Sequence, residues 1–177
     1  MTKFSLRSLD SAPADQLAAL QADAFAEHLQ SGPLAEVIAS ESAARSAAAD
    51  SPLRSPFGLA AFRGDVLVGW SQGYREGTHQ FYMLNSGVAR TERRKGVYSM
   101  LVKALLAHAQ AQGYSLVRSR HVAANSAVII AKLKLGFMVS GFEYSEVYGP
   151  LVQLTCLLNP ERRKLYADRA APLRPAA

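Results

Sequence analysis

The sequence predicts a mixed α/β domain in which a strongly twisted sheet of about seven strands, partly antiparallel and partly parallel, carries helices on both faces. Short apolar runs separated by glycine-containing turns are typical of antiparallel strands. An apolar run, a helical pattern and another apolar run follow one another over residues 81–121, which is the pattern of a parallel crossover unit. The chain has 177 residues, 49% of them hydrophobic and 19% charged, so we expect one globular domain.

Residues 1–56 are expected to form a strand and two helices. Residues 4–9 alternate apolar and polar side chains, as a half-exposed strand does. Ser11 is a suitable cap for the helix that follows, with Pro13 in its first turn. The inner face of this helix would carry Leu17, Leu20, Ala24, Phe25 and His28. A weakly amphipathic helix is predicted over residues 33–50, and the two prolines in residues 51–56 indicate a loop.

Residues 57–158 are expected to hold the rest of the sheet. Residues 57–62 and 66–70 flank a turn at Gly64-Asp65, which predicts a hairpin. A second turn at residues 76–79 leads into a short apolar strand at residues 81–84. Three antiparallel strands therefore precede the basic segment that follows.

That basic segment, Arg93-Arg94-Lys95, lies between the strand at residues 81–84 and a predicted helix. The helix has an apolar stripe of Val97, Leu101, Ala104, Leu105 and His108. Cations are unfavourable at a helix N-terminus, where unpaired N–H groups already carry partial positive charge. An anionic ligand would explain them, and phosphate is the best match. Gly96 would allow the ligand to approach the backbone closely.

The remaining elements follow from glycine stops and apolar patterns. The helix should run from about Gly96 to Gly113 and lead into a parallel strand at residues 114–121. An apolar helix from about Asn125 should end at Gly136, packed against the sheet and other elements. Residues 137–144 and 151–155 predict a hairpin about Gly149-Pro150. Residues 159–177 should form a short helix, at about 160–170, and a frayed tail.

Two motifs carry a resemblance to a known family. Arg93-x-x-Gly96-x-Tyr98 resembles the acyl-CoA pyrophosphate loop of GNAT superfamily N-acetyltransferases, and the segment from Asn125 to Gly136-Phe137 resembles a later motif of that family. The resemblance covers residues 57–158 well and the first third loosely. It implies a GNAT-like fold over residues 1–177, acetyl-CoA as cosubstrate, and transfer of an acetyl group to a primary amine of a small molecule or peptide.

The resemblance also implies a set of cofactor-binding residues. On the strand before the loop, the pantetheine arm would lie against Ser86, Gly87 and Val88, with the N–H near Val88 polarising the thioester carbonyl. Gly87 would suit a bulge or a close ligand. Asn125 would bind the cofactor or cap its helix. The pyrophosphate loop itself would consist of Arg93, Arg94, Lys95, Gly96, Val97, Tyr98 and Ser99.

Two positions depart from the family pattern, and the proton-transfer groups stay open. Tyr98 replaces a small residue, so its ring either turns away from the phosphates or adds a hydroxyl donor. Lys132 stands where the family commonly has a tyrosine that protonates the leaving thiolate, and we expect it to be a solvated or phosphate-facing cation. His121, at a strand end, is the candidate catalytic residue. The alternatives are Glu76, His79, Glu143, Tyr144 or no dedicated base.

Composition limits the other functions. The net charge of +6 could indicate nucleic-acid binding, but the basic groups at residues 90–95 and 162–164 have no interleaved aromatic residues, so nucleic acid is only the runner-up partner. The single Cys156 predicts a packed thiol and no disulfide, and no metal site is predicted. No membrane span or signal pattern is seen, so we expect a cytoplasmic protein. A non-catalytic acyl-CoA-binding regulatory module and a homodimer remain open alternatives.

Overall fold

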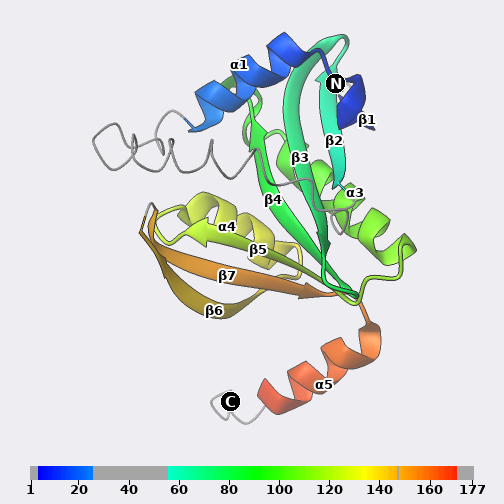
Figure 1. Ribbon diagram of the computed structural model, residues 1–177, viewed down its shortest axis with the longest axis vertical. Coiled ribbons are helices and arrows are strands. Elements are labelled where there is room, and N and C mark those ends of the chain that lie inside the picture. The colour runs from blue at the N-terminus through cyan, green and yellow to red at the C-terminus, as the bar shows by residue number, and fades with distance from the viewer. Residues whose placement is uncertain (1–3, 26–55, 147, 171–177) are drawn as a thin grey trace.

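The computed structural model describes residues 4–25, 56–146 and 148–170 (Figure 1). These residues contain a seven-stranded sheet in the order β1-β2-β3-β4-β5-β7-β6. The strands are β1 Phe4–Ser8, β2 Pro56–Arg63, β3 Val66–Glu76, β4 Gln80–Val88, β5 Leu116–Val122, β6 Met138–Ser145 and β7 Gly149–Leu157. The helices are α1 Ala14–Phe25, α3 Val97–Ala111, α4 Ser126–Lys134 and α5 Pro160–Ala170. The helix expected over residues 33–50 lies outside the described residues.

The predicted change from antiparallel to parallel pairing occurs between β4 and β5. All other neighbouring strands are antiparallel, and β4 pairs with β5 only from Gln80 to Tyr82, opposite Leu116 to Arg118. Beyond Tyr82 the two strands diverge, and the strand direction turns strongly between the two halves of the sheet (Figure 1). The mixed, twisted sheet predicted from the sequence is confirmed.

Helices cover both faces of the sheet. Gly69 and Trp70 are neighbours on β3 and therefore point to opposite faces. A Cβ atom on Gly69 would contact Val97 and Leu101 of α3. Trp70 instead packs in a buried cluster with Leu20 of α1, so α1 and α3 lie on opposite sides. Cys156 is buried in the cluster that also contains α3 side chains, which confirms the packed thiol.

Two local predictions were wrong. Ser11 does not cap α1, because residues Leu9–Ser11 form a 3-10 turn in which the Ser11 hydroxyl donates to the Ser8 carbonyl at 2.6 Å. Pro13 takes the place before the helix, and its carbonyl accepts from the N–H of Leu17. The expected face residue His28 lies outside the described residues.

The second wrong prediction concerns α4, which was expected to be packed between the sheet and other elements. Ile130 and Leu133 are 51% and 42% exposed, because only one side of this helix faces the sheet. The residue that α4 buries is Lys132. None of the described helices is both long and apolar enough to cross a membrane.

Candidate functional site

A wedge opens between β4 and β5 where their pairing ends. The last paired residues are Tyr82 and Arg118, and the next residues along the two strands are Met83 and Ser119. Lys132 reaches both from α4, with its Nζ atom 2.7 Å from Ser119 Oγ and 3.4 Å from Met83 Sδ. An amine therefore lies at the apex of the wedge. The segment Ser86 to Val88 lies on the diverging part of β4, as expected.

Lys132 is not the solvated or phosphate-facing cation predicted from the sequence. The structure buries it completely, with Nζ 4.7 Å from the centroid of the Phe137 ring. The cause is the orientation of α4, which turns this position toward β4 and β5 while Ile130 and Leu133 face outward. Its described contacts include no carboxylate, and burial lowers the pKa of Lys132 to about 7.

His121 is connected to this amine through Ser119. His121 Nε2 lies 3.2 Å from Ser119 Oγ, which also accepts from Lys132. Burial and, to a smaller extent, the charge of Lys132 together lower the pKa of His121 to about 3. The imidazole is therefore neutral at physiological pH, and the three side chains form one hydrogen-bonded chain on the inner side of β5.

The basic loop after β4 has a backbone shape suited to an anion. Arg94 has φ of +64° and Gly96 has φ of +86°, both in the left-handed region. Gly96 directly precedes α3, and no side chain in the described part of the chain caps this helix. The amides of the first turn, at Val97, Tyr98 and Ser99, have no acceptor within the helix and can bind a phosphate. The Val97 side chain is fully buried, so only its amide can take part.

The loop cations are anchored in different ways. Arg93 Nε donates to the carbonyl of Val88 at 3.3 Å, which fixes the loop to the end of β4. Lys95 lies 3.3 Å from Glu92, a side chain only 2% exposed. Glu92 also pairs with Arg63 of β2 at 2.9 Å, so this acid ties the loop to the sheet and partly balances Lys95.

Gly87 has a packing role instead of the expected bulge. The bulge in β4 is at Leu84, because Gln72 pairs with Asn85 and Gly73 pairs with Met83. A Cβ atom on Gly87 would overlap the six-membered ring of Trp70, so glycine is required there to seat the indole.

Tyr98 turns its ring into the core, which was one of the two expected orientations. The ring packs against buried clusters on the α3 side of the sheet. Its hydroxyl is buried and makes no hydrogen bond of good geometry to the described residues. Burial raises the pKa of Tyr98 to about 12, and the Ser86 hydroxyl on the diverging part of β4 opposes this shift. A buried hydroxyl that lacks a firm partner is thus placed close to Ser86 on the diverging part of β4.

Asn125 acts as a helix cap. Its side-chain oxygen accepts from the N–H of Val128 at 3.3 Å, as expected at the start of a helix. This capping contact explains why Asn125 is present even if no ligand binds it. The second lone pair of the same oxygen and the side-chain NH₂ can still make other hydrogen bonds.

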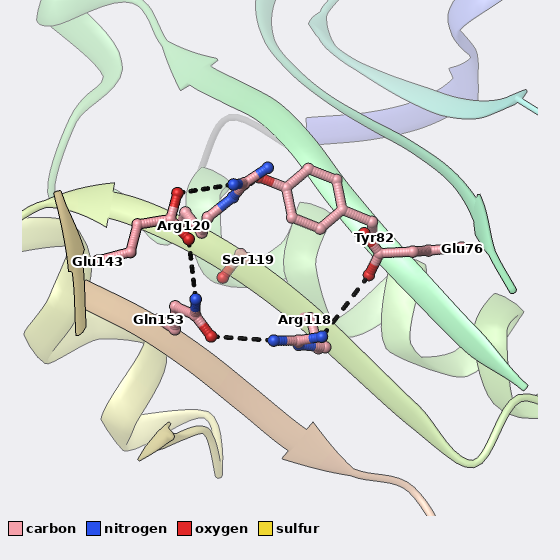
Figure 2. Close-up of a pocket in the computed structure, with 7 residues that line it drawn as sticks. All are labelled: Glu76, Tyr82, Arg118, Ser119, Arg120, Glu143 and Gln153. Carbon is pink, nitrogen blue, oxygen red and sulfur yellow. Dashed lines mark hydrogen bonds and ion pairs between the residues drawn. The ribbon is translucent and has the colours of Figure 1, made fainter. Parts of the chain in front are cut away.

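A polar hollow of about 140 Å³ opens on the sheet face opposite Lys132 (Figure 2). The side chains of Arg118 and Arg120 point to this face because they alternate with Ser119 along β5. Arg120 donates to the Tyr82 hydroxyl at 2.9 Å and to Glu143 at 2.7 Å. The hollow is lined by Glu76, Tyr82, Arg118, Ser119, Arg120, Glu143 and Gln153.

Gln153 links Glu143 to Arg118 and so completes this network. It donates to Glu143 at 2.8 Å and accepts from Arg118 at 2.9 Å. Arg120 and then Gln153 hold the pKa of Glu143 below its usual range, which makes this carboxylate a poor base. Sequence reasoning named Glu143 and Glu76 but missed both arginines. The alternation of Arg118 and Arg120 in a predicted strand was a signal that could have placed them on one face.

The other two alternative bases lie away from this network. His79 is in the β3–β4 turn, where its Nδ1 lies 2.6 Å from Thr78 Oγ1. Tyr144 is 79% exposed and, by strand alternation, faces away from Glu143. Among the described residues, no group of three or more His, Cys, Asp or Glu side chains could hold a metal ion.

Comparisons with known proteins agree with this geometry. The sequence profile of the Acetyltransferase (GNAT) family matches residues 15–137. No curated protein matches the chain. An N-acetyltransferase from Staphylococcus aureus Mu50 superposes with a TM-score of 0.66 at 17% identity, covering 89% of this chain and 99% of the other.

Two further solved structures share the fold. The ribosomal-protein-S18-alanine N-acetyltransferase from Escherichia coli has a TM-score of 0.62 at 13% identity, covering 89% of this chain and 95% of its own. A Bacillus anthracis str. Ames protein assigned as a streptothricin acetyltransferase, in complex with acetyl coenzyme A, has a TM-score of 0.55 at 15% identity, covering 62% and 65%. Since the family profile spans more than half of the sequence, the chain belongs to the GNAT acetyltransferase family.

Proposed function

We propose that this protein is an acetyl-CoA-dependent N-acyltransferase that transfers an acetyl group to a primary amine of a small molecule or peptide. The observation that carries the proposal is the wedge itself. β4 leaves β5 after three paired residues and ends at a basic loop with a left-handed glycine before α3. A free strand edge beside a phosphate-binding turn suits a long ligand with a pyrophosphate at one end. The Bacillus anthracis relative, whose structure contains acetyl coenzyme A, supports this assignment.

The residues present fit such a ligand. Apart from Gly96 and its two chain neighbours, no atom of the described residues lies within 4 Å of the position that a Cβ on Gly96 would take, so the loop leaves open space there. Arg93, Arg94, Lys95 and the amides from Gly96 to Ser99 would hold the pyrophosphate. The backbone of Ser86, Gly87 and Val88 would pair with the pantetheine arm, and the buried Tyr98 hydroxyl lies where a polar ligand atom would give it a partner. Asn125 keeps its cap and is a secondary candidate.

We further propose that the chain from His121 to Lys132 manages the proton. Acetyl-CoA supplies the acetyl group as an activated thioester. The proton lost by the acceptor amine must finally reach the departing sulfur. With a pKa of about 7, Lys132 is present both as amine and as ammonium near neutral pH, so it can hold or release a proton at Nζ. His121, with a pKa of about 3, is a weak base and acts through Ser119 as a relay.

Calorimetric titration with acetyl-CoA and with CoA tests the binding site. We expect Gly96→Glu to weaken both affinities at least about 100-fold, because a carboxylate at this position repels phosphate and blocks the amides. Gly64→Glu is the matched control, since Gly64 has φ of +63°, equally open surroundings and a place in the β2–β3 turn. Wild-type protein that binds neither ligand would overturn the proposal.

Turnover is then measured as release of free thiol in the presence of primary amines. Thiol release that depends on the amine supports the acyltransferase. Tight binding without thiol release for any amine would instead favour the non-catalytic acyl-CoA-binding module.

A further inference from the structure

The polar hollow described above contains more hydrogen-bond donors than acceptors. A guanidinium has five N–H donors. Arg118 uses two of them, toward Gln153 at 2.9 Å and toward Gln80 at 3.5 Å. Arg120 also uses two, toward Tyr82 and Glu143. Among the described residues, each guanidinium therefore has three N–H groups left for another partner.

The acceptors of the hollow are already occupied or distant. One oxygen of Glu143 accepts from Arg120 and the other from Gln153. Glu76 is 4.0 Å from Arg118, the outer limit of an ion pair, and is 39% exposed. Arg118 is thus held in place mainly by neutral amides, which fix its position without neutralising its charge. A ligand that brings acceptor oxygens would satisfy the free donors.

The polar hollow, with its unused hydrogen-bond donors, lies next to the wedge. Tyr82 and Arg118, the last paired residues of β4 and β5, both line it (Figure 2). Lys132 reaches the same apex from the opposite face. The hollow therefore lies where an acceptor molecule could approach an acetyl group held between the two strands.

We propose that this hollow binds the carboxylate of the acceptor, with the Arg118 guanidinium as its main partner, and that the acceptor is a small amino acid in which a short spacer separates carboxylate and primary amine. This inference rests on the proposed acyltransferase function. The volume of about 140 Å³ equals that of roughly five water molecules, enough for a carboxylate and a few carbon atoms. Arg120, neutralised by Glu143, would shape the hollow and donate in addition.

The test compares matched acceptors in the thiol-release assay. The twenty standard amino acids, their carboxamides and the corresponding decarboxylated amines are offered with acetyl-CoA. We expect the best amino acid to have a kcat/KM about 10- to 100-fold above those of its carboxamide and its decarboxylated amine, the factor typical of a hydrogen-bonded charge pair. Equal or faster turnover of the amines that lack a carboxylate would overturn the inference and leave the acyltransferase function intact.

Arg118→Gln isolates the proposed contact. It should raise KM for the amino acid about 10- to 100-fold, leave the kcat/KM of the carboxamide unchanged, and leave the calorimetric affinity for acetyl-CoA unchanged. Arg7→Gln on β1, whose partner Asp65 is 99% exposed, is the control and should change none of these values. An equal loss for acid and carboxamide would assign Arg118 a purely structural role and overturn the inference.

Direct binding supplies a readout that needs no turnover. The preferred amino acid is titrated into protein saturated with free CoA, and we expect binding that Arg118→Gln weakens by the same factor. Absence of binding to the wild-type complex would contradict the inference. Failure to bind acetyl-CoA at all would instead contradict the proposed function, so the two failures are distinguishable.

Discussion

Lys132 places an amine in surroundings that offer it one hydroxyl, one thioether and one aromatic ring. A buried ammonium without a carboxylate partner is costly, and the folded protein reduces this cost by releasing the proton. The helix that carries it has exposed Ile130 and Leu133 instead. Burying a lysine while leaving two large apolar side chains exposed lowers the stability of the fold. Such a loss of stability is common where a side chain serves function.

The stability of the protein should therefore depend on pH through Lys132. Its pKa is about 7 when folded and about 10.5 when unfolded, so between these values the unfolded chain binds more protons. The free energy of unfolding should rise with pH across this window, by up to about 5 kcal/mol, and reach its lower plateau below pH 7. Lys132→Met should remove this rise and stabilise the protein by about 1–4 kcal/mol at pH 6.

Urea unfolding followed by circular dichroism at pH values from 6 to 10 measures these changes. Lys103→Met is the control, because Lys103 is an exposed lysine on α3. It should leave the slope of stability against pH intact. A wild-type slope retained in Lys132→Met would mean that other groups cause it.

Lys132 also marks a limit of sequence reasoning at the residue scale. A lysine in an apolar helix is expected on the solvent side, because charged side chains are rarely buried without a partner. Lys132 is buried because of the rotation of α4 relative to β4 and β5. That rotation depends on contacts between residues that are distant in sequence. The family pattern marked the position as functional but could not give its environment.

At the element scale, α4 depends on the cap at Asn125. Asn125→Ala should lower the free energy of unfolding by about 1 kcal/mol, because the N–H of Val128 loses its acceptor. Asn125→Ser keeps a capping oxygen and should retain most of the stability. Chemical denaturation of both variants, with calorimetric titration of acetyl-CoA, separates the two roles. Weaker binding by both variants, with only the alanine variant destabilised, would identify a cofactor contact beyond the cap.

The elements themselves were largely readable from the sequence. The hairpin at Gly64 and the strand–helix–strand crossover from β4 to β5 occur where alternation and glycine turns predicted them, and α5 begins and ends as expected. These features are local. The bulge at Leu84 and the polar hollow were not predicted, because both depend on register between strands far apart in sequence. The basic loop could be singled out as a candidate site because its residues are contiguous in the sequence, and its binding of a cofactor stays a prediction.

At the scale of the whole molecule, the sheet consists of two halves joined by a short parallel seam. β1 to β4 form one half and β5 to β7 the other, and the seam has three residue pairs. On the side facing the wedge, the backbone of residues 83–88 has no strand partner among the described residues. We expect their amides to exchange hydrogen faster than those of residues 80–82.

Acetyl-CoA should change this exchange pattern. The acetyl-CoA concentration is set to 100 times its dissociation constant. Where hydrogen exchange in residues 83–99 requires opening of the bound site, we expect its rate to fall by up to about 100-fold. Residues 58–66 serve as the internal reference and should change little. Hydrogen–deuterium exchange with mass spectrometry measures both segments. A uniform slowing along the chain would indicate global stabilisation and contradict binding along β4.

Several basic side chains have partners within the fold. On α5, Arg162 donates to the Ser115 hydroxyl and Arg163 to the carbonyls of Leu157 and Leu158, so these cations attach the helix to the sheet. Arg63 and Arg120 pair with carboxylates. These contacts hold the named cations in place but leave the net charge at +6, so the argument against the nucleic-acid alternative remains that the basic groups at residues 90–95 and 162–164 have no interleaved aromatic residues.

Trp70 gives the molecule an optical property of its own. It is the single tryptophan of the chain, it is fully buried, and its indole N–H donates to Asn85 at 2.9 Å while its ring lies against Gly87. Both neighbours belong to the diverging part of β4. Fluorescence excited at wavelengths that tyrosine does not absorb therefore comes from one indole beside the wedge, and a shift of that strand alters its emission without any attached dye.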